Sequence, residues 1–299
     1  MIEAAISERM ALPAWPREGV AEYLFSVRSW GGLSLGNGVH EFDWTLEVDA
    51  RRGLVSVESF RSDDDEGGQP LGVFRRLMSD EELRVFGGVL ERARLGYARP
   101  PLTVHPAYTQ RNYRLQQPGR PTIALVINNA ERAANEEILE LRHAIMYLLS
   151  DCLEHPERSV RVDFALGTEG FLITITNHGM EKVCFTDPRW IEGEGRMRRA
   201  VVRMTELAVQ TPGSPPPSLA WEDSGLEPML LRPLDEPLVT MTPGATLRLR
   251  APVVGRDRRK RYVAYFSWAN YGGEAMVKGA YRIRGRADSN RLILEGDQG

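Results

Sequence analysis

The chain has 299 residues, enough for two ordinary domains that each bury a core. Its hydrophobic content of 42% and charged content of 26% are those of a soluble globular protein, and no apolar run approaches the ~18 residues that a membrane-spanning helix needs. Residues 1–158 carry 18 Arg against 24 acidic residues, hence a net charge of −6, whereas residues 159–299 carry 20 basic against 17 acidic residues, hence +3. Neither half is basic enough to be typical of a nucleic-acid-binding domain.

The first residues contain Glu3 and Glu8 and lack the basic start and apolar region of a signal peptide, so we expect a cytoplasmic protein. The two cysteines, Cys152 and Cys184, fall on different predicted elements, which is too few for a disulfide framework or a zinc site. We expect both to be small buried apolar residues, and we expect no metal or other cofactor.

After an extended lead-in over residues 1–19, alternating apolar and polar residues predict a strand over 21–29 and a hairpin over 42–60. The turn of the hairpin is Arg51-Arg52-Gly53. The acidic run that follows, within 62–70, lacks the alternating oxygen ligands of a calcium loop, so a solvated loop is the better interpretation.

Ser79 and Glu82 have the spacing of a capping box and predict a helix that runs to about Arg94. A short strand at 112–116 comes next. The segment 121–128 is apolar on both faces, which predicts a central strand. The strongest helical pattern covers 136–154, with Asn135 as its N-cap.

This order of strand, hairpin, helix, strand and helix predicts an α+β domain over residues 20–157, with an antiparallel sheet packed against two helices. The hairpin at 45–60 followed by the helix at 78–94 resembles bacterial α+β domains of unknown function, over about residues 20–155. The resemblance implies a fold and no activity.

From Ser159 onward the pattern changes to short strands with frequent turns, which predicts a β-sandwich over residues 158–299. Residues 171–176 alternate as a half-buried strand, and Asn177-His178-Gly179 supplies a turn. In 241–252 a Pro-Gly turn precedes a strand whose Leu247 and Leu249 point inward. The segment 197–209 satisfies both strand and helix spacing, and we interpret it as a strand.

Two segments carry a second resemblance: I-T-I-T-N-H-G-M-E-K-V-C-F-T-D-P at 173–188 and M-T-P-G-A-T-L-R-L-R-A-P at 241–252. They resemble bacterial immunoglobulin-like sandwiches, including those of the intracellular proteinase-inhibitor type. This resemblance implies an all-β, immunoglobulin-like C-terminal domain.

No catalytic motif is assigned. Glu140 and His143 have the Glu-x-x-His spacing of a di-iron helix, but no second such pair falls on a predicted helix, so a solvent-facing polar stripe is the better interpretation. His178 forms a triad with Asp163 or Asp187 only if the fold brings a serine near. A hydrolase with a cleft between the domains, using His143 or His178, remains the alternative from the enzyme class.

The strongest functional pattern is a basic run at 256–261, which a solvated, charge-rich turn would also explain, beside the aromatic strand predicted at 261–270. Tyr262, Phe266 and Trp268 share one face of that strand, and Tyr265 and Tyr271 lie on the other. Because only one face of a sandwich strand can point into the core, aromatic residues on the second face need another cover, which is either a partner or a domain contact.

Aromatic residues with Arg are typical of interface hot spots. We therefore predict a protein-binding module of inhibitor, immunity or adaptor type. Nucleic-acid binding through the 256–261 loop is the second alternative. The predicted partner-binding residues are Arg256, Arg258, Arg259, Arg261, Tyr262, Tyr265 and Trp268.

Overall fold

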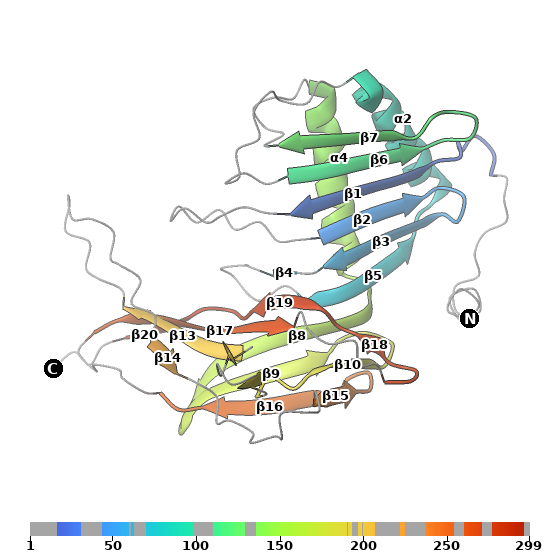
Figure 1. Ribbon diagram of the computed structural model, residues 1–299. Helices are drawn as coiled ribbons and strands as arrows, with labels where there is room; N and C mark the ends of the chain where they lie inside the picture. Colours follow the sequence, from blue (N-terminus) through green and yellow to red (C-terminus); the bar gives the residue numbers. More distant parts are fainter. Residues whose placement is uncertain are drawn as a thin grey trace, which may run out of the picture. The chain divides into compact units, whose positions relative to one another are not determined.

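The computed structural model describes residues 17–30, 44–59, 61–62, 70–97, 110–128, 136–189, 191–192, 197–198, 200–206, 222–224, 237–253, 260–270 and 277–295. These residues form mostly β-strands, in several sheets, with two α-helices (Figure 1). The chain divides into two compact units. Unit 1 comprises Met1–Glu58 and Val73–Pro156, and unit 2 comprises Ser59–Gly72 and Glu157–Gly299. Residues 59–72 thus belong to unit 2, although their position in the sequence predicts a place in the N-terminal domain.

Unit 1 is built on a sheet with the strand order β5-β3-β2-β1-β6-β7. The registered pairs β1–β2, β1–β6 and β6–β7 are all antiparallel. The strands are β1 (Leu24–Trp30), β2 (Trp44–Asp49), β3 (Leu54–Ser59), β5 (Leu71–Leu77), β6 (Gln110–Gln116) and β7 (Ile123–Asn128).

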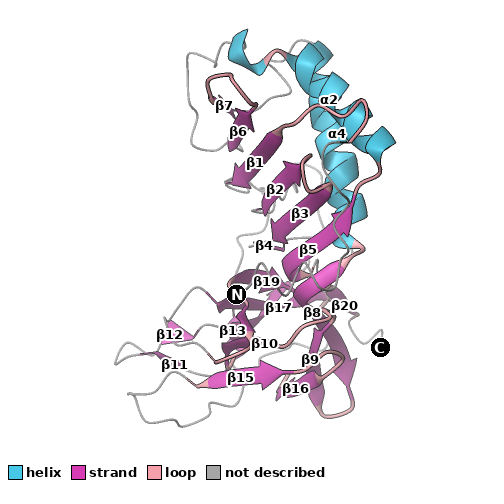
Figure 2. Ribbon diagram, turned by 90° about the vertical axis from the view of Figure 1, so that its right-hand side faces the viewer, coloured by secondary structure: helices cyan, strands magenta, loops and turns pink. Residues whose placement is uncertain are grey.

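Helices α2 (Asp80–Ala93) and α4 (Glu136–Leu153) cover one face of this sheet (Figure 2). The capping box of α2 is confirmed, because the Ser79 hydroxyl accepts from the Glu82 amide at 3.2 Å and the Glu82 carboxylate accepts from the Ser79 amide at 2.7 Å. The 3₁₀ turn η1 (Leu95–Tyr97) follows α2. Neither helix has the length and apolarity to cross a bilayer, a statement that covers the described residues only.

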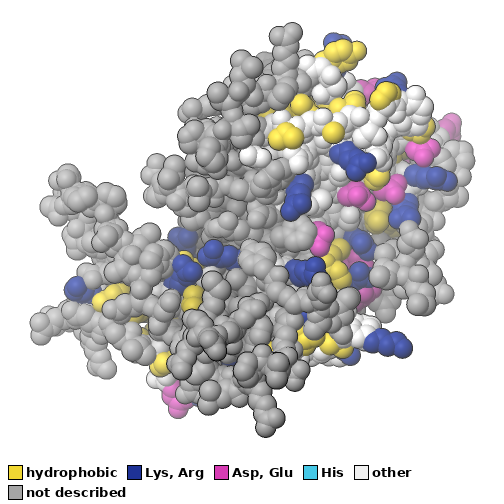
Figure 3. All heavy atoms as spheres, in the orientation of Figure 1, with side chains coloured by type: hydrophobic (Ala, Val, Ile, Leu, Met, Phe, Trp, Pro, Cys, Tyr) yellow, Lys and Arg dark blue, Asp and Glu magenta, His cyan; other side chains and the backbone are white. Residues whose placement is uncertain are grey.

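The core of unit 1 lies between the sheet and the helices. Alternate residues of β1 face the helices, and the Phe25 ring lies 5.4 Å from the Phe86 ring of α2 and 6.4 Å from the Tyr113 ring of β6. Tyr23 donates a hydrogen bond to the Leu83 carbonyl at 3.0 Å. The helix-free face carries basic, acidic and apolar side chains intermixed (Figure 3).

Two expectations about unit 1 require correction. The strand at 121–128, expected at the centre of its sheet, is β7 and lies at the end of the strand order. Its second apolar face is exposed instead of buried, with Val126 46% exposed. Strand β5 was not predicted, because its seven residues begin L-G-V-F, which has no clear alternation, and stand directly before the helix cap.

Unit 2 contains the strand orders β16-β9-β8, β15-β10-β18 and β14-β13-β17-β19-β4, with β20 also paired to β17 and a separate pair β11–β12. Most registered pairs are antiparallel, whereas β10–β18 and β19–β4 are parallel. The strands are β4 (Arg61–Ser62), β8 (Pro156–Gly167), β9 (Gly170–Asn177), β10 (Val183–Thr186), β11 (Ile191–Glu192), β12 (Met197–Arg198), β13 (Ala200–Glu206), β14 (Glu222–Ser224), β15 (Leu238–Met241), β16 (Thr246–Ala251), β17 (Tyr262–Asn270), β18 (Tyr281–Arg282), β19 (Gly285–Asp288) and β20 (Leu292–Leu294).

The core of unit 2 takes side chains from different sheets, among them Ile173 of β9, Leu249 of β16 and Phe266 of β17. Leu249 is buried and its neighbours Arg248 and Arg250 are exposed, as their alternation predicts. The ambiguous segment at 197–209 contains strand β13, which confirms the strand interpretation.

Candidate functional site

The aromatic strand predicted from sequence is β17, and its inward face is part of the unit 2 core. Tyr262 is 8% exposed, and Phe266 and Trp268 are fully buried. The Trp268 ring contacts the Phe185 ring edge to face, with centroids 5.0 Å apart. Tyr262 and Trp268, two of the predicted partner-binding residues, therefore present no ring on the surface of the described structure.

The opposite face of β17 carries Val263 and Tyr265, both half-buried. Strand register places Arg203 of β13 directly beside Tyr265, and Ile293 of β20 directly beside Val263. Arg291, just before β20, places its guanidinium 5.8 Å from the centre of the Tyr265 ring. We call these five side chains the Tyr265 face.

The Tyr265 face combines an exposed apolar residue with an aromatic ring flanked by arginines. Ile293 is 59% exposed, among the most exposed large hydrophobic residues in the described part of the chain. The cation of Arg291 lies within the range of a favourable cation–π contact with Tyr265, which stiffens both side chains. Tyr and Arg side chains beside exposed apolar residues are the composition of a protein-binding hot spot.

Basic residues border this face. Arg261 pairs with Glu295 at 2.8 Å, but both side chains are more than half exposed, at 53% and 65%, so the pair is of little energetic value and a partner can replace it. Lys260 is also exposed. The remaining predicted residues of the loop, Arg256, Arg258 and Arg259, lie outside the described residues.

Four of the five residues of the Tyr265 face were not predicted as partner-binding residues: Arg203, Val263, Arg291 and Ile293. The sequence R-L-I-L at 291–294 does indicate that Ile293 is exposed. Alternation along a strand places its side chain on the other face from those of Leu292 and Leu294. Leu294 is indeed buried and Ile293 exposed. The position of Arg203 on this face follows only from the pairing of β13 with β17.

The Glu-x-x-His pair lies on the exposed side of α4, as expected for a polar stripe. Arg92 of α2 donates from Nε to the Glu140 carboxylate at 3.0 Å, and these hydrogen bonds lower the pKa of Glu140. His143 is exposed. No group of three or more potential metal ligands occurs among the described residues.

The two carboxylates considered for a triad are bound by arginines. Arg189 donates to Asp187 at 2.6 Å, and Arg161 donates to Asp163 at 3.1 Å. His178 is exposed. The described geometry therefore gives neither carboxylate the role of orienting a histidine.

Both thiols are buried and free, which confirms the expectation. Burial raises the pKa of Cys152 to about 12, and its Sγ lies 3.8 Å from the Val55 carbonyl oxygen. Because the thiolate is the nucleophile, Cys152 is unreactive near neutral pH.

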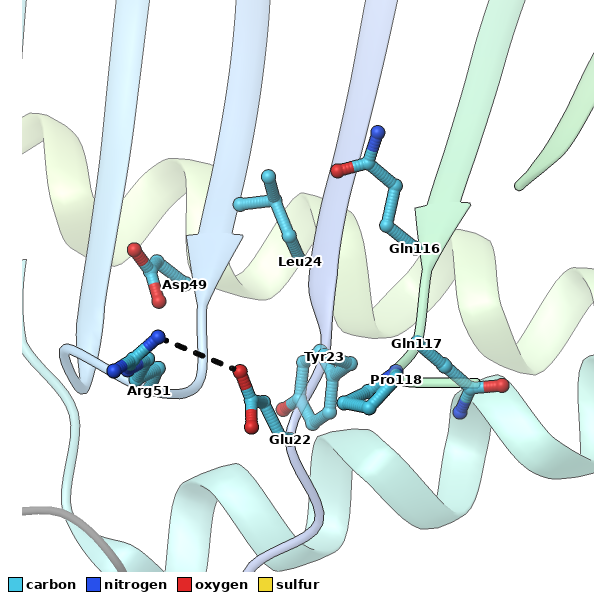
Figure 4. Close-up of a pocket in the computed structure, with 8 residues that line it drawn as sticks. All are labelled: Glu22, Tyr23, Leu24, Asp49, Arg51, Gln116, Gln117 and Pro118. Carbon is cyan, nitrogen blue, oxygen red and sulfur yellow. Dashed lines mark ion pairs between the residues drawn. The ribbon is translucent and has the colours of Figure 1, made fainter. Parts of the chain in front are cut away.

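A pocket of about 420 Å3 lies at one end of the unit 1 strands, between the start of β1 and the turns after β2 and β6 (Figure 4). Its charged groups already have partners, since Arg51 points to Glu22 at 4.0 Å and the Arg52 amide donates to Asp49 at 3.0 Å. We assign no ligand to it. The pocket is lined by Glu22, Tyr23, Leu24, Asp49, Arg51, Gln116, Gln117 and Pro118.

No protein-family model, curated protein or solved structure matches this chain. Function must therefore be inferred from the geometry of the described residues, and the Tyr265 face is the surface whose chemistry is most distinctive.

Proposed function

We propose that unit 2 is a non-enzymatic protein-binding module, of inhibitor, immunity or adaptor type, and that it docks its partner on the Tyr265 face. The observation that carries this proposal is Ile293 of β20, which is 59% exposed, lies directly beside Val263 and is two residues from Arg291, whose guanidinium contacts the Tyr265 ring. Solvent-exposed β-branched residues beside aromatic rings are costly to leave in water and gain most from a partner that covers them.

Charge supports a partner with an acidic surface. Arg203, Arg261 and Arg291 lie on or beside the Tyr265 face; Glu295 pairs with Arg261, and strand register places Asp223 of β14 beside Arg203. Complementary charge would speed association and fix orientation, while the exposed apolar residues would supply affinity. Exposed apolar residues favour protein over nucleic acid, whose binding is dominated by phosphate contacts.

We also propose a specific fold for each unit: an immunoglobulin-like sandwich for unit 2 and an α+β domain for unit 1. A shared core between sheets supports the sandwich, and the helix-covered antiparallel sheet supports the α+β assignment. Two free buried thiols fit the reducing cytoplasm.

Affinity capture from the native host tests the proposal, using the wild-type chain, Tyr265→Ala and Ile293→Asp. We expect one partner to be retained by the wild type and lost by both variants. With that partner purified, calorimetry should show about thirtyfold weaker binding for Tyr265→Ala, which corresponds to about 2 kcal/mol.

Val85→Asp is the matched control, because Val85 is an apolar β-branched residue with a similar exposure of 57% on helix α2. It should bind as the wild type does. Equal loss in Val85→Asp and Ile293→Asp would contradict the proposal. Binding to heparin or nucleic acid with a steep salt dependence and no effect of Ile293→Asp would favour the nucleic-acid alternative instead.

A further inference from the structure

The helix-facing side of the unit 1 sheet contains a buried cation that has no counter-ion among the residues the structure describes. Arg111, on β6, is only 8% exposed, forms no ion pair among the described residues, and its Nε has no hydrogen-bond partner. Arg17 has the same exposure but pairs with Asp80 at 3.0 Å. Buried arginines are normally compensated in this way, because removing a charge from water is unfavourable unless an opposite charge replaces the hydration.

Two further unpaired donors lie beside Arg111. Strand register places Ser29 of β1 directly opposite Arg111, and Tyr113 follows two residues along β6 on the same face. Ser29 is 1% and Tyr113 2% exposed, and neither hydroxyl has a hydrogen-bond partner among the described residues. Directly opposed residues on antiparallel strands have Cβ atoms about 4.5–5.5 Å apart, so the three polar groups form one patch.

The electrostatic environment of this patch is positive. Burial raises the pKa of Tyr113, and the charges of Arg111 and Arg142 of α4 act in the opposite direction. The Tyr113 hydroxyl thus lies beside the Arg111 guanidinium. A phenol that keeps its proton is a hydrogen-bond donor, as are the serine hydroxyl and the guanidinium.

Three donors and a positive field fit an oxyanion. A planar carboxylate has two oxygens, which a guanidinium fork occupies, whereas a phosphate group has enough oxygens for the guanidinium and both hydroxyls.

We propose that unit 1 binds a phosphate group, free or as a small phosphomonoester, on the helix-facing side of β1 and β6, with Arg111, Tyr113 and Ser29 as the donors. This site is independent of the Tyr265 face, because all three residues belong to unit 1.

Titration calorimetry on the full chain tests the site with inorganic phosphate and with glycerol 3-phosphate, each against chloride at the same ionic strength. We expect at least one of the two to bind and to raise the unfolding temperature as its concentration increases. Stronger binding of inorganic phosphate identifies a free anion as the ligand, and stronger binding of glycerol 3-phosphate identifies a phosphomonoester.

Arg111→Gln should weaken binding about tenfold to hundredfold, the range for losing a charged hydrogen bond. Arg114→Gln is the matched control, since Arg114 is exposed on the other face of the same strand, and it should bind as the wild type does. Tyr113→Phe keeps the ring and removes only the hydroxyl. It should weaken binding severalfold even if Arg111→Gln does not fold.

Binding of neither phosphate compound, beyond the effect of chloride, would overturn the proposal. So would binding that persists at wild-type strength in Tyr113→Phe and Arg111→Gln, or a loss of equal size in Arg114→Gln.

Discussion

At the scale of single residues, Arg76 links three elements of unit 1. From β5 its guanidinium pairs with Glu82 of α2 at 2.8 Å and with Asp151 of α4, and its side chain is only 12% exposed. Burial alone would raise the pKa of Glu82, but hydrogen bonds from Ser79 and Arg76 outweigh it, so the pKa of Glu82 is lowered. One carboxylate thus serves both the helix cap and the ion pair.

Glu82→Gln should therefore change how stability depends on pH. A lowered pKa in the folded state means that the carboxylate stabilises the fold above its ordinary pKa of about 4.5 and loses that contribution as pH falls through the folded value. We expect the variant to be about 0.5–1 kcal/mol less stable at pH 7, and the difference to shrink as the pH falls below about 4.5. Urea unfolding at a series of pH values measures this difference in stability.

The control for this experiment is the same substitution in an Arg76→Met background. There the pH-dependent difference should shrink, because only the contacts with Ser79 remain. A difference of the same size in both backgrounds would show that Arg76 does not lower the pKa of Glu82.

Gly53 is the second residue with a strong local requirement. Its φ is 63°, and a Cβ there would overlap the guanidinium of Arg17, which is buried and paired with Asp80. Gly119 has a similar φ of 70°, but no described atom lies within 4 Å of the position that a Cβ would take there. Comparing substitutions at these two glycines therefore separates the energetic cost of the positive φ from the cost of displacing Arg17.

Gly53→Ala should destabilise unit 1 by about 2–4 kcal/mol and Gly119→Ala by about 1 kcal/mol, the backbone cost alone. Urea unfolding midpoints give both values. If the two substitutions cost the same, Arg17 moves aside freely and the steric explanation is wrong.

Residues whose partners are close in sequence could be predicted, whereas residues that strand pairing brings together could not. The capping box at Ser79 and Glu82 was predictable, because its partners are three residues apart and the pattern is local. The Tyr265 face was predicted only in part, because Arg203 and Arg291 join Tyr265 through strand register over separations that no local pattern encodes. The unpaired state of Arg111 likewise depends on which side chains β1 and α4 place near it.

At the scale of elements, β7 shows how an apolar strand can lie at a sheet edge. Ile127 is 4% exposed and faces the helices, whereas Val126 on the other face is 46% exposed. A run that is apolar on both faces predicts a central strand only when a second layer covers the other face, and a sequence does not reveal that layer. The error at β7 therefore follows from tertiary structure and not from the local pattern.

Lysine substitutions in β7 test this arrangement. Val126→Lys should change stability by no more than about 0.5 kcal/mol, because the side chain reaches water, whereas Ile127→Lys should cost more than about 3 kcal/mol by placing a charge in the core. Thermal and urea unfolding compare them. Unfolding of Val126→Lys would mean that another surface covers this face.

The strands β4, β18 and β20 were also not predicted, and each has only two or three residues. The two-residue strands β4 and β18 are too short to show a period, and their pairing partners fix them: β4 pairs with β19, and β18 with β10. The long helices and the hairpins at β2–β3 and β8–β9 were predicted because amphipathic or alternating patterns extend through them.

At the scale of the whole molecule, unit 2 is discontinuous in sequence. Leu71 is fully buried in its core cluster, and Arg61 and Ser62 pair with β19, although the rest of the unit begins at residue 157. Gly72 lies so close to the Arg158 backbone that any Cβ would overlap its carbonyl. The segment 59–72 is thus an integral part of unit 2.

A fragment of residues 157–299 should therefore be less stable than unit 2 in the full chain, by about 2 kcal/mol for the loss of Leu71 alone. Near-UV circular dichroism, which senses packing around Trp268, should show weaker tertiary structure and a lower urea midpoint. Adding a peptide of residues 59–72 should restore part of both. A fragment with the midpoint of the full chain and no response to the peptide would contradict this account.

The discontinuity of unit 2 also determines the order in which its paired strands become available during synthesis. At ribosomal speeds of ~5–20 residues per second, β19 leaves the ribosome about 10–45 s after β4, the strand with which it pairs. During that interval the nascent chain carries the apolar Leu71 without its neighbours, while all of unit 1 is already available once residue 156 has emerged. The amino-terminal unit is thus free to fold first, and the carboxy-terminal unit can be completed only after β19 has emerged.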